Sequence, residues 1–277
     1  MPPAQRAAGD HNALMSETAT GEGAVRLDVS GPIASVVFDR PHAHNALTWT
    51  MYEQLGAICT RLASEPSVRV VALRGAGGKA FVAGTDIAQF AAFAGADDGV
   101  AYERRIDAGV DALERLPMPV VAILEGWVIG GGLALAAAAD LRIATPDARF
   151  GVPIARTLGN CLSSANTARL VGGFGPGLAK RMLLLAELID AEEAKSAGFV
   201  TQVVARDQLD AAASAMCERL AGHAPLTMHA AKETMRRLRG AVEVDDTDLV
   251  RLCYGSADFR EGVAAFVAKR PARWQGR

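Results

Sequence analysis

One stretch constrains the fold of this chain more than any other. Residues 123–140 read ILEGWVIGGGLALAAAAD, an apolar segment that passes through a turn and three consecutive glycines into a helix of small residues. The first turn of a helix has backbone N–H groups without intrahelical partners, and the helix dipole adds positive charge there. Glycine lets a ligand approach that backbone closely. The stretch therefore predicts a cradle for an anion, or for an oxygen that becomes negatively charged during a reaction.

A second glycine-rich segment lies upstream. Residues 68–74 (VRVVALR) predict a buried strand, and GAGGKAFVAGTDI follows at residues 75–87. Gly84 and Gly131 are about 47 residues apart in the sequence. We hypothesise that these two sites each aim one backbone N–H at the same oxygen. The loose GxGxxG/A match at Gly75–Ala80 is a weaker signal for a dinucleotide site, because the residues after it do not read as a helix start.

The hydrophobic pattern predicts a mixed α/β chain with a helical end. We expect a hairpin at residues 25–38, strands at 68–74, 120–124, 141–145 and 200–204, and helices at 49–64, 97–116 and 131–139. The later helices are expected at residues 163–171, 176–185, 191–197, 208–221, 225–239, 245–254 and 259–269.

Five segments together resemble the crotonase (enoyl-CoA hydratase/isomerase) superfamily. They are residues 39–48 (DRPHAHNALT), 80–87 (AFVAGTDI), 125–140, 150–153 (FGVP) and 268–271 (AKRP). The resemblance spans about residues 24–277 and implies a spiral of ββα turns with a helical C-terminal region that mediates trimer contacts. It implies a crotonase-like core at 24–205 and a C-terminal helical region at 206–277, while the Ala-, Gly-, Pro- and polar-rich composition of residues 1–23 predicts a disordered tail.

The resemblance also implies a binding mode. In this family an acyl-CoA thioester binds with its carbonyl oxygen held by two backbone N–H groups, which here are those of Thr85 and Gly131. Losing one such donor typically costs ~10²–10³ in rate. Because only the backbone is needed, we expect the side chain of Thr85 to be dispensable. The positions expected to contact substrate or CoA are His44, Ala46, Ala83, Thr85, Asp86, Ile87, Ala88, Gly131 and Lys269, and those expected to line the pocket are Trp127, Ala134, Ile154 and Arg156.

The sequence departs from the family at the two glutamates that hydratases use. Ala134 stands at the first of these positions, and Ile154, or Ala155 in a shifted alignment, stands at the second. General acid–base groups contribute ~10²–10⁴ each, so we expect weak or undetectable hydration of crotonyl-CoA. Carboxylates from elsewhere, such as Glu103 or Asp107, are possible replacements.

The function expected from these residues is an acyl-CoA-processing enzyme that stabilises a thioester enolate in a backbone oxyanion hole. The alternatives are a CoA-thioester hydrolase or decarboxylase, an atypical hydratase or isomerase, a β-diketone hydrolase that uses no CoA, and a non-catalytic acyl-CoA-binding subunit. Arg156 is a candidate to bind a substrate carboxylate. We expect no permanently bound cofactor and no metal, with the CoA thioester as substrate and a homotrimer or dimer of trimers as the assembly.

Composition narrows the class of protein. The 29 basic and 31 acidic residues of the 277 are dispersed, so no nucleic-acid surface is expected. The four cysteines form no CxxC pair, which favours a reducing, cytoplasmic location. The uncharged piece at residues 126–139 is shorter than the ~18 residues of a membrane span. The N-terminal residues lack the apolar region of a signal peptide, and Met15 is an alternative start.

Overall fold

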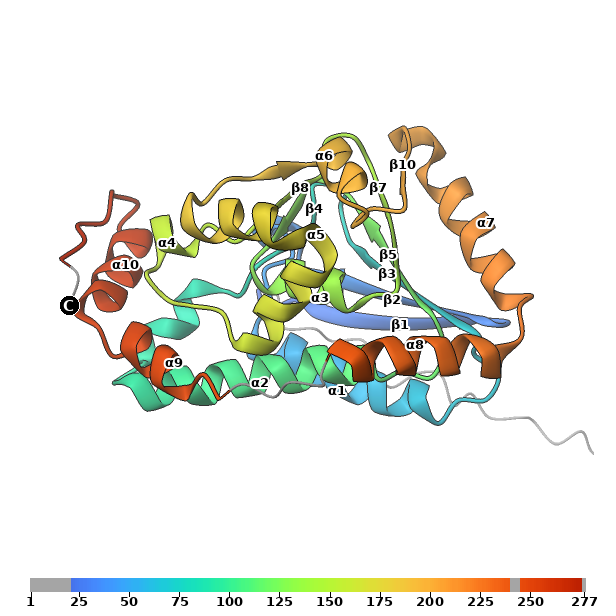
Figure 1. Cartoon of the computed structure of the whole chain (residues 1–277), viewed down its shortest axis with the longest axis horizontal. Helices are drawn as coiled ribbons and strands as arrows, with labels where there is room; N and C mark the ends of the chain where they lie inside the picture. The colour runs from blue at the N-terminus through green and yellow to red at the C-terminus, as the bar shows by residue number, and fades with distance from the viewer. Residues whose placement is uncertain (1–20, 240–244, 276–277) are drawn as a thin grey trace, which may run out of the picture.

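The computed structural model describes residues 21–239 and 245–275 (Figure 1). Most of the predicted N-terminal tail, with the alternative start at Met15, lies outside the described residues. The chain enters through strands β1 (Ala24–Ser30) and β2 (Ile33–Asp39), which pair antiparallel across Gly31 and Pro32. Gly31 has a positive φ of 57°, the left-handed region that glycine enters without steric cost. The predicted hairpin is therefore confirmed.

A six-stranded sheet forms the larger framework. Its order is β1-β2-β3-β5-β7-β10, with β3 at Val70–Gly75, β5 at Val120–Leu124, β7 at Leu141–Ala144 and β10 at Gln202–Val203. Every pair after the first hairpin is parallel. In β3, Val71 and Leu73 join the main core, whereas Val70 and Ala72 join the cluster beneath α7 (Leu209–Ala221). Both faces are covered, which explains why the parallel strands read as continuous apolar runs.

A smaller sheet carries the glycine segments. It has the order β4-β6-β8-β9, with β4 at Ala80–Ala83, β6 at Trp127–Ile129, β8 at Arg149–Gly151 and β9 at Ile189–Asp190. Strands β4 and β6 are parallel neighbours, and Ala83 pairs with Ile129. Since parallel strands end at the same sheet edge, the residues that follow them are brought side by side. Gly84 follows the first strand and Gly130 the second.

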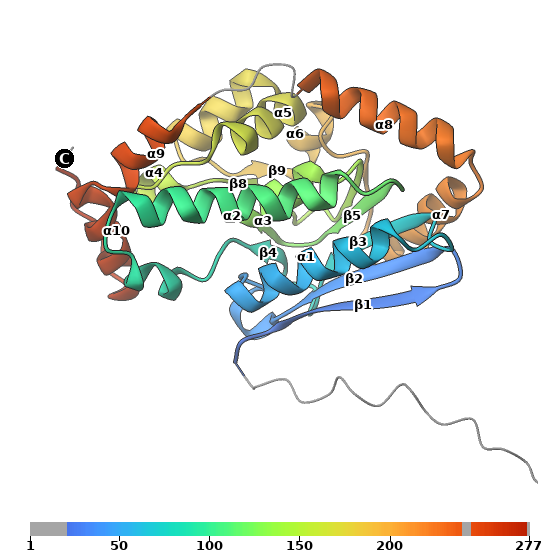
Figure 2. The same ribbon diagram turned by 90° about the horizontal axis from the view of Figure 1, so that it is seen from below.

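Two long helices cover the framework. Helix α1 (Trp49–Ala63) begins at Thr48, whose side chain accepts a hydrogen bond from the backbone N–H of Met51. Helix α2 (Ala96–Glu114) runs beside α1 along one side of the molecule (Figure 2). The short, almost wholly apolar α3 (Gly131–Ala138) is buried among α2, α5 and β4.

The C-terminal part is helical as predicted. Helix α5 (Ser164–Leu184) covers two predicted helices and breaks between them at Gly175, where φ is 74°, before Pro176. The remaining elements are η1 (Pro41–Ala43), η2 (Ile87–Ala92), α4 (Ile154–Thr157), α6 (Ala191–Ser196), η3 (Arg206–Gln208), α8 (Pro225–Arg239), α9 (Thr247–Tyr254) and α10 (Ala257–Val267). Figure 1 places α9 and α10 at one end of the molecule and α7 at the other. Among the described helices, none is long and apolar enough to cross a membrane.

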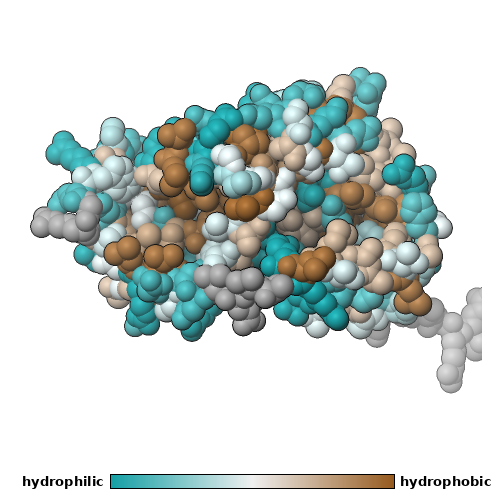
Figure 3. Space-filling model, viewed as in Figure 1, coloured by the Kyte–Doolittle hydropathy of each residue, from teal (hydrophilic) through white to brown (hydrophobic). Residues whose placement is uncertain are grey.

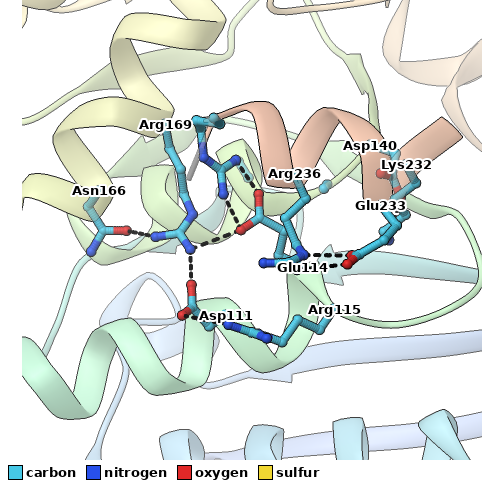
Figure 4. A network of polar contacts seen from close by, with 12 residues as sticks. Asp111, Glu114, Arg115, Asp140, Asn166, Arg169, Lys232, Glu233 and Arg236 are labelled. Carbon is cyan, nitrogen blue, oxygen red and sulfur yellow. Dashed lines mark hydrogen bonds and ion pairs between the residues drawn. The ribbon is translucent and has the colours of Figure 1, made fainter. Parts of the chain in front are cut away.

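A network of charged side chains joins these helices to α2 (Figure 4). Arg169 of α5 is almost fully buried and pairs with Asp111 and with Glu114, the latter at 3.0 Å. Arg239 of α8 pairs with Glu114 as well. Removing one partner of such a buried pair strands the other charge, at a typical cost of ~3–5 kcal/mol. The network therefore fixes where α5 and α8 sit on α2.

Candidate active site

A cavity of about 460 Å³ lies between the small sheet and the helices that surround it. Its wall is mostly apolar and comes from the loop after β2, the ends of β4 and β6, α2, the segment around α4, and α10. The polar and charged residues of the wall are Arg40, His44, Thr85, Asp86, Tyr102, Glu103, Thr157, Asn160 and Asn166. An apolar hollow with a few polar groups is the usual form of a small-molecule site.

The two glycine segments meet at this cavity. Gly84 and Gly130 both have positive φ, 94° and 54°. A Cβ added at Gly130 would lie 3.7 Å from the Cα of Gly84, so the two loops are in contact. Thr85 and Gly131 come next in each loop and both line the cavity. Within the described part of the chain, the backbone N–H of neither residue donates a hydrogen bond. The sequence hypothesis that the two sites converge agrees with this geometry.

The glycines after Gly130 are needed for close packing. A Cβ at Gly132 would lie 2.1 Å from the carbonyl oxygen of Val82, so a residue with a side chain does not fit at this position. A Cβ at Gly131 would lie 2.8 Å from the hydroxyl of Tyr52. Gly132 thus allows α3 to sit directly against β4, which brings the start of the helix beside Thr85.

Two tyrosines that sequence reasoning missed hold Thr85. Its Oγ1 lies 2.8 Å from the Tyr52 hydroxyl and 2.8 Å from the Tyr102 hydroxyl, and all three side chains are buried. Burial raises the pKa of both tyrosines above the ordinary value near 10, so both stay neutral. These contacts give the Thr85 side chain a structural role beside the backbone N–H that was predicted to bind substrate. Tyr52 and Tyr102 gave no sequence signal beyond their place on helix faces.

Glu103 is a buried carboxyl group in the cavity wall. It is 4% exposed and lies on α2 next to Tyr102. The Tyr254 hydroxyl donates to its Oε1 at 2.5 Å, and the Ser163 N–H donates to its Oε2 at 3.1 Å. Burial raises the pKa of Glu103 to about 8, with a smaller contribution from nearby Asp107, while the two hydrogen bonds oppose the rise. Such a shift is typical of an acid–base group.

Of the polar residues near Glu103, Asp107 lies outside the cavity and Asn160 lines it. Asp107, the other replacement offered by the sequence, does not line the cavity and instead accepts hydrogen bonds from Ser163 Oγ (2.7 Å) and Asn166 Nδ2 (2.9 Å). Asn160 Nδ2 donates to the Tyr254 hydroxyl at 3.1 Å. Among the described residues, the Oδ1 of Asn160 is buried without a hydrogen-bond partner. Asn160 also lines the cavity.

The structure brings most of the predicted site residues together. Those that line the cavity are His44, Ala46, Ala83, Thr85, Asp86, Ile87, Gly131, Ala134 and Ile154. Ala88, Trp127, Arg156 and Lys269 do not line it. Ala134 and Ile154, where the resemblance led us to expect no catalytic glutamate, supply no ionisable group to the wall.

The four residues outside the cavity have physical reasons to be there. Trp127 is 40% exposed because strand side chains alternate and Val128 takes the buried position. On α4, Ile154 and Thr157 are three residues apart and share the cavity face, so Arg156 points elsewhere and is exposed. The pocket-lining predictions for Trp127 and Arg156 are therefore wrong.

The other two positions lie at the edges of helices. Ala88 is exposed, and its N–H donates to the Asp86 side chain at 3.1 Å. Lys269 is exposed just beyond α10. Within residues 21–239 and 245–275, no cluster of three His, Cys, Asp or Glu side chains could hold a metal ion.

Comparison with known proteins identifies the class. The family model described as enoyl-CoA hydratase/isomerase matches residues 28–277, and the chain belongs to this family. A crotonyl-CoA hydratase of Syntrophomonas wolfei is 32% identical over 255 residues, which cover 90% of this chain and 96% of the relative.

Solved structures agree with this assignment. An enoyl-CoA hydratase/carnithine racemase from Magnetospirillum magneticum has 34% identity and a TM-score of 0.75, with 91% of this chain and 96% of that one covered. A methylmalonyl-CoA decarboxylase in complex with 2-nitronate-propionyl-CoA has 26% identity and a TM-score of 0.84, with 91% and 98% covered. These matches confirm the predicted superfamily and its α/β fold with a helical C-terminal region.

Proposed function

We propose that this chain is an enzyme that binds CoA thioesters and stabilises an enolate of the acyl group. The observation that carries the proposal is the pair of unbonded backbone N–H groups, of Thr85 and Gly131, on two touching loops at one cavity. An enolate places negative charge on the thioester oxygen, and preorganised donors stabilise that charge by ~2.7–4 kcal/mol each. The named relatives are enzymes of CoA thioesters, which supports the same substrate class here.

The cavity wall also suggests where the CoA part lies. We place CoA against two segments of the cavity wall, the loop after β2 and the residues around the end of β4. These segments carry His44, Ala46, Ala83, Asp86 and Ile87. Ala88 and Lys269 lie outside the cavity, so their contacts with CoA depend on the part of the ligand that extends beyond it. In this arrangement Lys269 binds CoA phosphates, from its own chain or across an interface.

The assembly belongs to the same proposal. Large apolar side chains are exposed on the helical part, including Leu184, Leu185, Leu226, Met235, Leu238, Leu249 and Leu252. Figure 3 shows several separate apolar areas on the face that carries these helices. Exposed apolar area of this kind marks an interaction surface. We propose a homotrimer or a dimer of trimers. The four cysteines are free thiols, which supports the proposed reducing, cytoplasmic location.

Enolate formation can be measured before the natural acyl group is known. Butyryl-CoA carrying deuterium next to the thioester carbonyl should lose that deuterium to water in the presence of the protein, and acyl-CoAs should raise the melting temperature. At ligand concentrations ~100-fold above Kd the stabilisation is about 2.7 kcal/mol. Parallel assays with crotonyl-CoA and methylmalonyl-CoA separate hydration, thioester hydrolysis and decarboxylation.

The donor itself is tested with Gly131→Pro. Gly131 is the first residue of α3, where the fixed φ of proline is compatible with a helix. Proline also adds a Cβ 2.8 Å from the Tyr52 hydroxyl, so Gly131→Ala, which adds the same Cβ and keeps the N–H, is the matched control. We expect deuterium loss to fall ~10²–10³-fold. Circular dichroism must show a folded protein. A folded Gly131→Pro variant with wild-type exchange, or the lack of any acyl-CoA effect on wild-type protein, would contradict the proposal.

A further inference from the structure

We propose that Glu103 is the acid–base residue of this active site and transfers protons to and from the acyl group. The inference rests on the proposed function and deepens it, because Ala134 and Ile154 provide no carboxylate. Of the described residues that line the cavity, Asp86 and Glu103 are the carboxylic acids. Asp86 pairs with Arg40 at 2.8 Å and also accepts the N–H of Ala88. Glu103 forms no salt bridge with the described residues and borders the cavity.

The surroundings of Glu103 suit reversible proton transfer. Each carboxyl oxygen accepts one hydrogen bond, from Tyr254 or from Ser163 N–H, and keeps a further lone pair. Burial disfavours the carboxylate and these two donors favour it, so both protonation states are accessible near neutral pH. A catalytic group is most effective when its pKa lies near the working pH.

The position of Glu103 links it to the oxyanion donors. It follows Tyr102, whose hydroxyl is bonded to the Thr85 side chain, so one turn of α2 contacts both the donor loop and the cavity. Asn160 and Tyr254 act as positioning residues, because Asn160 Nδ2 donates to the Tyr254 hydroxyl, which in turn donates to Glu103.

The proposed step balances without any further reagent. The Glu103 carboxylate takes a proton from the carbon next to the thioester carbonyl. The C–H bond breaks, its electron pair becomes the C=C bond of the enolate, and the negative charge moves to the oxygen beside the N–H groups of Thr85 and Gly131. The new O–H of Glu103 then returns a proton to the acyl chain, which restores the carboxylate.

The isosteric variant Glu103→Gln gives the main test. It keeps the size and an acceptor for Tyr254 but cannot transfer a proton. With α-deuterated butyryl-CoA as the probe, we expect deuterium loss to fall ~10²–10⁴-fold while the thermal stabilisation by butyryl-CoA is retained. Exchange in Glu103→Gln at the wild-type rate would refute the role of Glu103 and leave the oxyanion proposal intact. Wild-type protein without binding or exchange would refute both.

A pH profile separates proton transfer from a structural role. Wild-type exchange should rise with pH as Glu103 ionises near pH 8. Tyr254→Phe removes a donor that favours the carboxylate, so its rising limb should move to higher pH. If Tyr254 were only structural, its substitution would lower the exchange rate without shifting the pH range over which the rate rises. This variant also keeps the proposal testable if Glu103→Gln does not fold, and an unmoved limb would refute the proposal.

Other titratable groups near Glu103 must be accounted for. Those that interact with it electrostatically are Tyr52 on α1, Tyr102 and Asp107 on α2, Cys161 after α4, Asp246 before α9 and Tyr254 on α9. The neighbouring Cys161 thiol lowers the pKa of the Cys253 thiol to about 7, within the same range. Cys253 does not line the cavity, so Cys253→Ser is the matched control. The pH limb of Cys253→Ser should coincide with that of wild type; a limb that disappears would assign it to the thiol and refute the proposal.

Discussion

The hydroxyl of Thr85 is predicted to be a structural requirement of the site, separate from the backbone donor. The variant Thr85→Val keeps the shape of the side chain and the backbone N–H but removes Oγ1. Tyr52 and Tyr102 would then each lose a partner now at 2.8 Å, in surroundings where all three side chains are buried. A buried polar group left without a partner costs about 1–3 kcal/mol.

The size of the effect follows from two such hydroxyls. We expect Thr85→Val to lower the free energy of unfolding by about 2–6 kcal/mol, which for a chain of this size corresponds to roughly 4–24 °C in melting temperature. The matched control is Thr85→Ser, which keeps the hydroxyl and loses one methyl group, a change that costs about 0.5–1.5 kcal/mol. Thermal and urea unfolding of the two variants beside wild type measure the difference.

Comparing the two variants shows whether the Thr85 hydroxyl stabilises the buried tyrosines. If Thr85→Val and Thr85→Ser unfold at the same temperature, the hydroxyl does not hold the tyrosines and the reasoning fails. Deuterium exchange of butyryl-CoA adds a second measurement. Because both variants keep the N–H of residue 85, each should lose less exchange activity than Gly131→Pro.

Three further predictions concern packing, acid stability and assembly. Gly132→Ala should strongly destabilise the fold because its Cβ would meet Val82 O at 2.1 Å, whereas Gly109→Ala on α2, where a Cβ meets open space, should be neutral or stabilising by up to ~1 kcal/mol in the same unfolding assay. The pKa of Glu114 is lowered, because hydrogen bonds from arginines and their charge outweigh the opposing effect of burial. The ionised Glu114 therefore stabilises the fold above pH 4.5, and this stabilisation is lost as the pH falls through the folded-state pKa. In urea unfolding between pH 3 and 7, the free energy of unfolding of Glu114→Gln should fall less at acidic pH than that of wild type. Light scattering at micromolar concentration should give a trimer or hexamer, and a monomer would contradict the proposed assembly.

The sequence predicted the large elements well because their patterns are long. The predicted helix 225–239 and strand 120–124 have the observed bounds. Apolar spacing along α1 and α2 recurs over several turns, so packing and propensity agree there. The break inside α5 lies between the two helices predicted at residues 163–171 and 176–185, at a point where Pro176 cannot continue a helix without losing a hydrogen bond.

The small sheet was not predicted from the hydrophobic pattern. Strands β4 and β6 have only four and three residues, too few for a periodicity to emerge. Their pairing depends on distant segments, as do the contacts of Thr85 with Tyr52 and Tyr102. Glu103 was named only as one of two possible carboxylates, because a helical pattern does not tell which buried face borders a cavity and which borders the core.

Helix α10 is synthesised after the segments that carry the oxyanion donors, and this affects when a new chain can become active. Phe266 of α10 lines the cavity, and Tyr254 of α9 donates to Glu103, so the last helices close the wall and orient the carboxyl group. The strands and glycine loops that carry Thr85 and Gly131 are made much earlier. A nascent chain can therefore assemble its oxyanion donors while the cavity is still open to water. The complete site forms only after α9 and α10 have been synthesised and have docked.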